Sequence, residues 1–297
     1  MKITILGTGR MGSAIGERLI DQGHTLFVWN RSIEKTKALT ARGASAFNSP
    51  AIATQDAEIV ISVLTDAKAI DSTYSSADGV LSANILGKLF IDMSTVRPQT
   101  GIELGAKLKS AGAAFIECPV GGTVGPAREG KLLGLVGGSV EDFERAKPLL
   151  EQLCRRVEHV GVLGSGASMK LAINLPLLVY WQALGEALLL AEKSGLDPEK
   201  IMSIMADTSG TPTIMKLRSS AVVSALKGEA ATPAHFNIDS IRKDLRTMIE
   251  EGKNLGFELP TTQASLGAFN QASEAGLGDM DGTQLPAWWI KNGKSNH

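Results

Sequence analysis

The sequence predicts an α/β protein of two domains, in which a doubly wound, mostly parallel sheet is followed by an all-helical domain. Strand and helix patterns alternate up to about residue 160, as in parallel sheets that carry helices on both faces. After Gly164 the strand patterns disappear and apolar residues recur at spacings of three and four, which indicates helices. We therefore expect domains at residues 1–162 and 163–297, joined by a long helix.

Short apolar runs in the first domain have the pattern of strands. They are residues 3–6, 25–29, 44–46, 58–63, 89–92, 114–117, 132–136 and 156–159. Helices are predicted between them, directly after Gly12, at residues 33–40, from Ser49-Pro50 onward and at residues 98–110. Serine is a preferred helix cap and proline suits the first helical turn, so Ser49-Pro50 marks a helix start.

The second domain is predicted to consist of helices at residues 171–191, 197–206, 214–226, 238–255 and 261–275. The first of them is apolar on most sides. Such a helix lies in a core or at a subunit contact, so we expect a homo-oligomer. Polar residues such as Asn174 and Gln182 interrupt it, which argues against a membrane span. Pro176 removes a helical hydrogen bond and is expected to kink the helix.

A glycine-rich segment, Gly7-Thr-Gly9-Arg10-Met11-Gly12, joins the first strand pattern to the first helix pattern. Gly7 permits a tight turn, Gly9 lets the backbone approach a pyrophosphate, and Gly12 lets the helix pack against the strand. The helix start, near Arg10 and Met11, would direct free N–H groups at the same anion. This pattern predicts a Rossmann-type domain that binds a dinucleotide. The alternative is a glycine-rich turn without a ligand.

The residues after the second strand indicate which dinucleotide is bound. NAD sites usually carry an acidic residue there, whereas an arginine accommodates the 2′-phosphate of NADP. This chain has Asn30-Arg31-Ser32, with a guanidinium and a hydroxyl and no carboxylate. We expect NADP as the cofactor, with NAD as the second candidate. In the alternative interpretation, Ser32 caps the helix at 33–40 and Arg31 is a solvated surface charge.

Composition excludes several classes of partner. With 30 basic and 31 acidic residues among 297, the chain has no charge excess suited to nucleic acid or an anionic membrane. Cys118 and Cys154 form no CxxC pair, which fits a reducing cytoplasm. The four histidines show no metal-ligand spacing, and the N-terminus has no signal-peptide pattern. We expect a cytoplasmic protein without a bound metal.

Two candidate ligand-binding segments follow predicted strands at their carboxyl ends, where parallel sheets meet ligands. Leu64 and Thr65 come after one strand, and Ser94 and Thr95 after another. For Ser94 and Thr95 the alternative is ordinary capping of the helix at 98–110. A third segment contains Gly121-Gly122-Thr123, where successive glycines free N–H groups for an anion and the threonine adds a hydroxyl. Its alternative is a flexible loop between strands.

Lys170 and Asn174 lie four residues apart in an otherwise apolar helix, so they share one face. An amine can act as a general acid or base when burial moves its pKa toward neutrality. An amide beside it can orient the oxygen that reacts. The alternative is a lysine at the surface.

These segments together resemble the β-hydroxyacid dehydrogenase family, which includes 3-hydroxyisobutyrate dehydrogenases and glyoxylate/succinic semialdehyde reductases. The resemblance covers nearly the whole chain and rests on several ordered motifs. They are Gly7-x-Gly9-x-Met11-Gly12, Asp92-x-Ser94-Thr95-x-x-Pro98, Pro119-Val120, Gly164-x-Gly166-x-x-x-Lys170-x-x-x-Asn174 and Lys243-Asp244-Leu245.

The resemblance implies an NAD(P)-dependent oxidoreductase that interconverts a short β-hydroxyacid and its semialdehyde by hydride transfer. It implies that Lys170 is the catalytic lysine and general acid/base, and that Asn174 orients the substrate. It also implies cofactor contacts by Leu64, Thr65, Thr95 and Lys243. The family's Rossmann domain, long helix and all-α domain, usually assembled as dimers or tetramers, agree with the organisation expected above.

The chain departs from the family in the loop that holds the substrate carboxylate. The usual Pro-Val-Ser-Gly-Gly reads Pro119-Val120-Gly121-Gly122-Thr123 here, so the serine hydroxyl is lost. We expect Ser94, Gly121, Gly122 and Thr123 to bind the substrate together with Asn174. Sulfolactaldehyde reductases carry a related Val-Gly-Arg-Thr loop, but this chain has Gly122 in place of the arginine. A sulfonate substrate is therefore an alternative to a carboxylate.

Two other functions remain open. Imine reductases share the two-domain plan but generally replace the catalytic lysine with Asp or Tyr, so Lys170 argues against them. A catalytically silent protein that senses a dinucleotide would not need the pair of Lys170 and Asn174.

Overall fold

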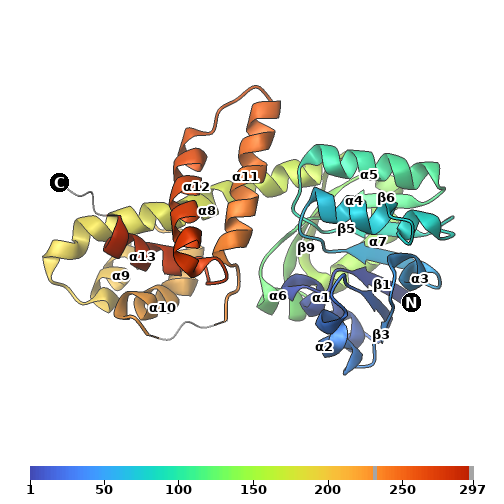
Figure 1. Ribbon diagram of the computed structural model, residues 1–297, viewed down its shortest axis with the longest axis horizontal. Coiled ribbons are helices and arrows are strands. Elements are labelled where there is room, and N and C mark those ends of the chain that lie inside the picture. Colours follow the sequence, from blue (N-terminus) through green and yellow to red (C-terminus); the bar gives the residue numbers. More distant parts are fainter. Residues whose placement is uncertain (230–232, 294–297) are drawn as a thin grey trace. The chain divides into compact units, whose positions relative to one another are not determined.

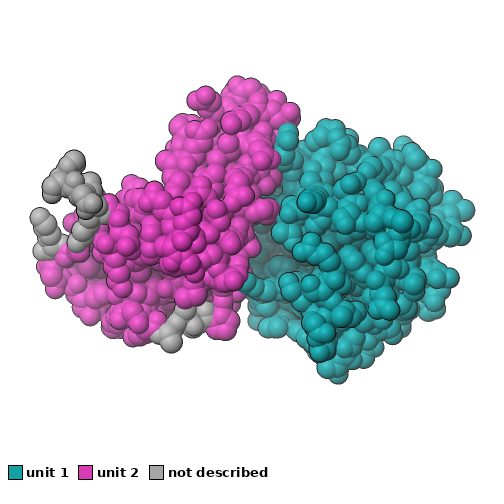
Figure 2. Space-filling view, viewed as in Figure 1, with its two compact units in different colours: residues 1–170 teal, residues 171–297 magenta. Residues whose placement is uncertain are grey.

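The computed structural model describes residues 1–229 and 233–293, which form two compact units (Figure 2). Unit 1 is Met1–Lys170 and unit 2 is Leu171–His297. The division falls inside helix α8 (Ser165–Ala191), whereas the sequence placed it before this helix, at 162/163. The start of α8 belongs to unit 1 because the N–H groups of Gly166 and Ala167 are hydrogen-bonded to Glu117 of the sheet.

Unit 1 is built on a nine-stranded sheet (Figure 1). Its strands are β1 (Lys2–Leu6), β2 (Thr25–Trp29), β3 (Ser45–Ala46), β4 (Ile59–Ser62), β5 (Leu89–Asp92), β6 (Ala114–Glu117), β7 (Val120–Gly121), β8 (Leu132–Gly137) and β9 (Cys154–Gly161). The strand order is β3-β2-β1-β4-β5-β6-β8-β7, and β9 pairs with β8. Strands β1 to β6 are parallel, whereas β8 runs antiparallel to β6 and β7. The order reverses between β1 and β4, and ligands of such sheets bind at the carboxyl ends of the strands at this point.

Two hydrophobic cores lie on the two faces of this sheet. Along β1, Ile3 and Ile5 join the core beneath α1 (Arg10–Asp21) and α7 (Val140–Leu153). Leu6 joins the core that includes residues of α4 (Ala67–Ser75) and α5 (Pro98–Ser110). The period of two in a strand sends alternate side chains to opposite faces, so both faces must be covered. The predicted fold class, a doubly wound and mostly parallel sheet, is confirmed.

The remaining helical segments of unit 1 are short. They are η1 (Ile33–Thr36), α2 (Lys37–Thr40), α3 (Pro50–Thr54), η2 (Val80–Ser82) and α6 (Val124–Arg128). The predicted start at Ser49-Pro50 is confirmed, since the Ser49 side chain accepts a hydrogen bond from Ile52 N. The helix predicted at residues 33–40 is divided into a 3₁₀ turn and one α turn. Strand β7 and helix α6 were not predicted, because two and five residues are too few to show a period.

Unit 2 is helical, as predicted. It contains the rest of α8 and then η3 (Glu192–Ser194), α9 (Pro198–Ala206), α10 (Thr213–Lys227), α11 (Ile238–Asn254), α12 (Pro260–Ala272), η4 (Ser273–Leu277) and α13 (Gln284–Asn292). Leu178, Trp181 and Leu188 of α8 are buried in its core together with Met215 and Phe269. The predicted helix at 261–275 ends earlier, because a π turn follows in which Gly276 has φ +90°. Helix α13 was not predicted.

Helix α8 continues from Ser165 to Ala191 through Pro176. It is also long and apolar enough to cross a membrane by length and composition, with 39% of that apolar stretch buried inside the structure. Its buried residues alternate with exposed apolar ones such as Ile173 and Leu190. The part of α8 that belongs to unit 2 therefore has some apolar side chains in the core of that unit and others open to solvent in the single chain.

Candidate active site

The glycine turn after β1 has the geometry that a dinucleotide requires. Gly7 has φ +98°, a conformation that residues with a side chain rarely adopt, and a Cβ there would collide with the Val63 carbonyl oxygen. A Cβ on Gly12 would collide with the Gly7 carbonyl oxygen. A Cβ on Gly9 would meet no described atom within 4 Å, so this glycine borders open space. Two glycines therefore shape the turn, and the third leaves room for a ligand.

Polar groups around the turn point to the same ligand. Helix α1 begins at Arg10 with no acidic residue in its first turn and, among the described residues, no side-chain cap. No carboxylate therefore competes with an anion at this helix N-terminus, where helices bind anions. The hydroxyl of Thr8 is buried and has no hydrogen-bond partner in the part of the chain that the structure describes. Buried polar groups usually have hydrogen-bond partners, and a ligand bound at the turn would supply one for the Thr8 hydroxyl. The residues present fit a pyrophosphate.

Asn30 connects the glycine turn to the end of β2. Its Oδ1 accepts a hydrogen bond from Thr8 N at 3.1 Å, and its Nδ2 donates to the Ser32 carbonyl oxygen at 3.0 Å. Arg31 and Ser32 are exposed, and Ser32 has an extended backbone at the start of η1. Asn30 thus braces the turn, while the next two side chains are accessible for a cofactor.

Buried hydroxyls join the loops that follow β4 and β5. Ser94 Oγ donates to Asp92 Oδ1 at 2.7 Å and accepts from Leu64 N at 2.9 Å. Ser62 Oγ donates to the same Asp92 oxygen at 2.6 Å and accepts from the Tyr74 hydroxyl. Burial raises the pKa of Asp92, against the lowering effect of both serine hydroxyls. Ser94 therefore fixes the loop of Leu64, and its predicted contact with the substrate remains a prediction.

The other predicted residues of these loops differ in exposure. Thr65 is exposed and Thr95 is half-buried. The next residue after Thr65, Asp66, accepts a hydrogen bond from Ala69 N at 2.8 Å and so caps α4. The cofactor contacts of Thr65 and Thr95 stay predictions.

The predicted anion-binding loop is a strand, a turn and a helix start. Gly121 pairs with Leu133 of β8, so its backbone is fixed by the sheet. Gly122 has φ +128°, and a Cβ there would lie 2.8 Å from the Leu132 side chain. Thr123 is the N-terminal cap residue of α6. The loop is thus held by β8 rather than being a plain flexible connection.

Lys170 and Asn174 lie on α8 and are both buried, with 8% and 7% of their surface exposed. The helix period places them one turn apart on the same side. Asn174 has a partner that the sequence did not reveal, because its Nδ2 donates to Asp244 Oδ2 at 3.2 Å. The other oxygen of Asp244 forms an ion pair with Lys243 Nζ at 2.6 Å. Asp244, 3% exposed, therefore links two of the predicted site residues.

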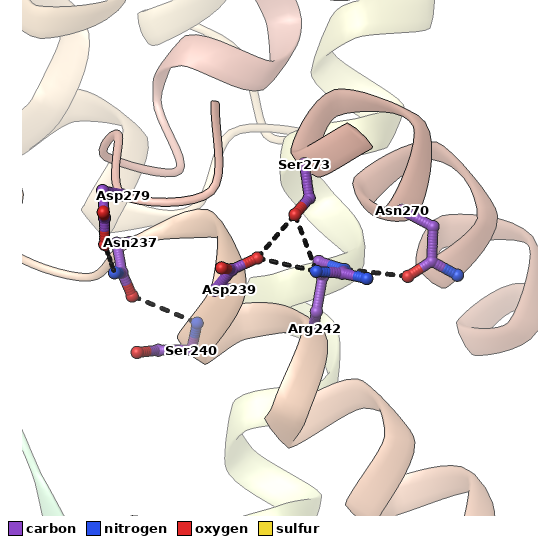
Figure 3. A network of polar contacts seen from close by, with 7 residues as sticks. All are labelled: Asn237, Asp239, Ser240, Arg242, Asn270, Ser273 and Asp279. Atoms are coloured by element: carbon purple, nitrogen blue, oxygen red, sulfur yellow. Dashed lines mark hydrogen bonds and ion pairs between the residues drawn. The ribbon is translucent and has the colours of Figure 1, made fainter. Parts of the chain in front are cut away.

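Helix α11, which carries Lys243 and Asp244, is anchored by a polar network (Figure 3). Arg242 donates to Asn270 Oδ1, Asp239 Oδ1 and Ser273 Oγ at 2.7 to 2.8 Å, and Ser273 also donates to Asp239. The hydrogen bonds from Ser273 and then Arg242 lower the pKa of Asp239. Because Arg242 immediately precedes Lys243, this network fixes the rotation of the helix at the predicted site.

Removing the Asp244 carboxylate is expected to cost both stability and activity. Asp244→Ala removes the hydrogen bond to Asn174 Nδ2 and the ion pair with Lys243, both made by a buried carboxylate, so the free energy of unfolding should fall by about 1–3 kcal/mol. Urea unfolding measures this loss, and initial rates should show a higher KM for the substrate. Glu250→Ala, an exposed acid on the same helix, should change stability by less than about 0.5 kcal/mol. Equal stability of the two variants would show that Asp244 does not bridge Asn174 and Lys243.

Two family models match this chain over nearly its whole length. Residues 2–161 match the NAD binding domain of 6-phosphogluconate dehydrogenase. Residues 164–289 match the family described as NAD-binding of NADP-dependent 3-hydroxyisobutyrate dehydrogenase. Both descriptions agree with the ligand that the glycine turn fits.

Individual proteins are similar over the same length. Glyoxylate/succinic semialdehyde reductase 1 of Arabidopsis thaliana is 32% identical over 281 residues, which cover 95% of this chain and 96% of that protein. The structure of 3-hydroxyisobutyrate dehydrogenase of Mycobacterium tuberculosis with L-serine has a TM-score of 0.85 at 25% identity and covers 99% of both chains. An imine reductase of Myxococcus stipitatus, at 20% identity and a TM-score of 0.67 over 96% of this chain and 98% of that one, shares the fold.

Proposed function

We propose that this protein, which belongs to the β-hydroxyacid dehydrogenase family, is an NADP-preferring reductase of short semialdehyde acids that also oxidises the corresponding β-hydroxyacids. Membership makes it an oxidoreductase with a nicotinamide cofactor. The observation that carries the proposal is the buried Lys170, one helical turn before the buried Asn174. The bound cofactor would supply or accept the hydride, and the glycine turn from Gly7 to Gly12 would hold its pyrophosphate.

The side chains of α8 would move the proton and orient the oxygen. In reduction, negative charge develops on the carbonyl oxygen, and the Lys170 ammonium would stabilise this charge and then donate its proton. In oxidation the neutral amine would take the proton of the hydroxyl group. Asn174, whose Nδ2 is held by Asp244, would orient the same oxygen. Burial of Lys170 keeps water away from the transfer.

Cofactor preference should depend on Arg31. A charge-assisted hydrogen bond to the 2′-phosphate predicts that Arg31→Ala raises the Kd of NADPH by about 10- to 100-fold and leaves that of NADH unchanged. Asn30→Asp keeps an acceptor for Thr8 N and adds a charge that repels the phosphate, so it should shift preference toward NADH. Fluorescence titration with both cofactors measures the change.

The matched control is Arg42→Ala, an exposed arginine of unit 1 that pairs with Asp21. It should leave both affinities unchanged. Similar Kd values for the two cofactors in the parent protein, together with no selective effect of Arg31→Ala, would refute the preference for NADP.

The predicted anion-binding loop, Gly121-Gly122-Thr123, favours a small carboxylate over a sulfonate as the head group of the substrate. Gly122 stands where sulfolactaldehyde reductases carry an arginine, and its φ of +128° would strain any residue with a side chain. The backbone is thus built for glycine, and the remaining donors are N–H groups and Thr123. Two relatives support the choice of substrate, because one is named for succinic semialdehyde and the structure of the other is described with L-serine, a 3-hydroxycarboxylate. Succinic semialdehyde and methylmalonate semialdehyde are therefore the first candidates.

A turnover screen tests the function. NADPH oxidation is followed with glyoxylate, the two semialdehydes, sulfolactaldehyde and cyclic imines. The highest kcat/KM is expected for a carboxylate with three or four carbons. A far higher value for sulfolactaldehyde would overturn the head-group choice, and activity on imines alone would overturn the reaction. NADPH binding without turnover of any substrate would favour a sensor.

We also propose that the protein is a cytoplasmic homo-oligomer. The exposed apolar residues of α8, which include Leu190 with 89% of its surface exposed, support an oligomer. The free thiols of Cys118 and Cys154 suit a reducing compartment.

A further inference from the structure

Glu117, the last residue of β6, is a buried acid outside the set of residues proposed to touch the substrate or cofactor. Only 3% of its surface is exposed. Its Oε1 accepts hydrogen bonds from Gly164 N and Gly166 N at 2.8 Å and from Ala167 N at 3.2 Å. One carboxylate oxygen thus receives three backbone N–H groups at the start of α8.

These contacts are well placed to hold a helix end. The first N–H groups of a helix lack partners within it, and its N-terminus favours negative charge. Glu117 satisfies Gly166 N and Ala167 N in the first turn and Gly164 N in the residue before α8. Because β6 lies inside the sheet, the helix start is tied to a rigid strand.

The surrounding elements leave space for the carboxylate. A Cβ added to Gly101 of α5 would lie 2.7 Å from Glu117 Oε2, and one added to Gly166 would lie 3.1 Å from Oε1. A Cβ on Gly137 of β8 would collide with Oε1. Glycines on three different elements therefore make room for this one side chain.

We propose that Glu117 is a positioning residue for Lys170, holding the first turn of α8 so that the lysine is presented in one orientation. The inference rests on the proposed function, in which Lys170 transfers the proton. Lys170 follows Ala167 by three residues, so its Cα is set by the turn that Glu117 holds. A shift of about 1 Å at a reacting group can lower the rate about 10²-fold. The hydrogen bonds by which Glu117 fixes this turn should therefore affect catalysis.

Because Glu117 can be protonated, its hydrogen bonds to the first turn of α8 should depend on pH. Burial raises the pKa of Glu117 to about 7, the three N–H groups oppose this rise, and the charge of Asp92 on β5 adds to it. Asp92 and the buried thiol of Cys118 are the titratable groups that interact with it, while α5 and β8 face it with Gly101 and Gly137. Below pH 7 the carboxyl is protonated and accepts the N–H groups more weakly. The rate should therefore fall as the pH is lowered through about 7.

Stability should follow the opposite trend. The pKa in the folded protein lies above the ordinary value of 4.5, so the folded state binds the proton more tightly than the unfolded state. The contribution of Glu117 to stability is therefore complete below pH 4.5 and is lost as the pH rises through 7. Removing the charge at pH 8 should not destabilise the fold, which separates a positioning role from a structural one.

The test is Glu117→Gln, which keeps the shape and removes the charge. At pH 8 its kcat should fall by about 10- to 100-fold, with KM for NADPH unchanged and a melting temperature equal to or above that of the parent. The acid limb of the parent's profile of kcat against pH, near pH 7, should be absent. Glu117→Asp, which keeps the charge, should restore part of the rate and of the limb. Glu103→Gln, an exposed acid on α5, should behave as the parent.

The outcomes separate this inference from the proposed function. Adding Glu117→Gln to Lys170→Ala should lower the rate no further, because Glu117 acts through Lys170. A parent-like kcat and pH profile in Glu117→Gln, or a lower melting temperature with no loss of kcat, would overturn the positioning role and leave the proposed function standing. If the parent protein turns over no substrate, the proposed function fails. Hydrogen exchange then tests whether Glu117 stabilises the first turn of α8. If exchange at residues 164–170 is no faster in Glu117→Gln than in the parent, the positioning role is overturned.

Discussion

Lys170→Ala is expected to lower kcat by about 10²–10⁴-fold, the usual range for a general acid–base group. The oxygen of the substrate would lose both its proton donor and the cation that stabilises its developing charge. The Kd of NADPH should change little, because the glycine turn and Asn30 are untouched. Stopped-flow measurement of NADPH oxidation at saturating substrate gives the comparison.

The control for Lys170 is Lys109→Ala, an exposed lysine of α5 in the same unit. It should retain the parent rate. Asn174→Ala should reduce the rate less than Lys170→Ala and act partly through KM, because the amide orients the oxygen without transferring its proton. A Lys170→Ala variant with nearly the parent kcat would mean that another group donates the proton.

Gly12→Ala and Gly9→Ala are expected to abolish or weaken cofactor binding for different reasons. A Cβ on Gly12 collides with the Gly7 carbonyl oxygen, so the free energy of unfolding should fall by about 1–3 kcal/mol and the turn should be displaced. A Cβ on Gly9 meets no described atom, so stability should change by no more than about 0.5 kcal/mol. It would nevertheless occupy the space of the pyrophosphate and raise the Kd of NADPH by about 10- to 100-fold.

The matched control is Gly267→Ala in α12, where a Cβ also meets no described atom within 4 Å. It should leave the Kd of NADPH unchanged and raise stability by about 0.5–1 kcal/mol, because glycine is unfavourable inside a helix. Urea unfolding and fluorescence titration measure both quantities. Tight NADPH binding by Gly9→Ala would show that the pyrophosphate does not approach this glycine.

The fold was predictable because its signals are repetitive. Apolar strands and the period of the helices recur over many residues, and β1 with its glycine turn carries a motif whose geometry the structure confirms. Short elements escaped prediction, since β7 and α6 depend on contacts with β8 and α1 that no local pattern encodes. The end of α12 was missed because the chain continues after Ala272 as the π turn η4, and the apolar pattern does not distinguish a π turn from an α-helix.

The candidate site was predictable only in part. Lys170 and Asn174 are visible in the sequence because they are polar residues in an apolar helix. Asp244 was seen as part of a motif, but its bond to Asn174 joins residues 70 positions apart and requires the fold. Thr8 and Glu117 gave no signal as single residues. Their importance lies in a hydroxyl without a partner and in a carboxylate that receives three N–H groups.

The carboxylate of Glu117 also determines which mutations can accumulate together. Gly101 lies inside α5, where alanine would ordinarily be more favourable by about 0.5–1 kcal/mol. The described atoms that a Cβ at Gly101 would approach all belong to Glu117. Gly101→Ala should therefore be harmful in the parent background and beneficial once residue 117 is shortened. The effect of Gly101→Ala is thus expected to change sign with residue 117, which is sign epistasis. An evolving lineage would therefore change residue 117 before it can use a better helix former at residue 101.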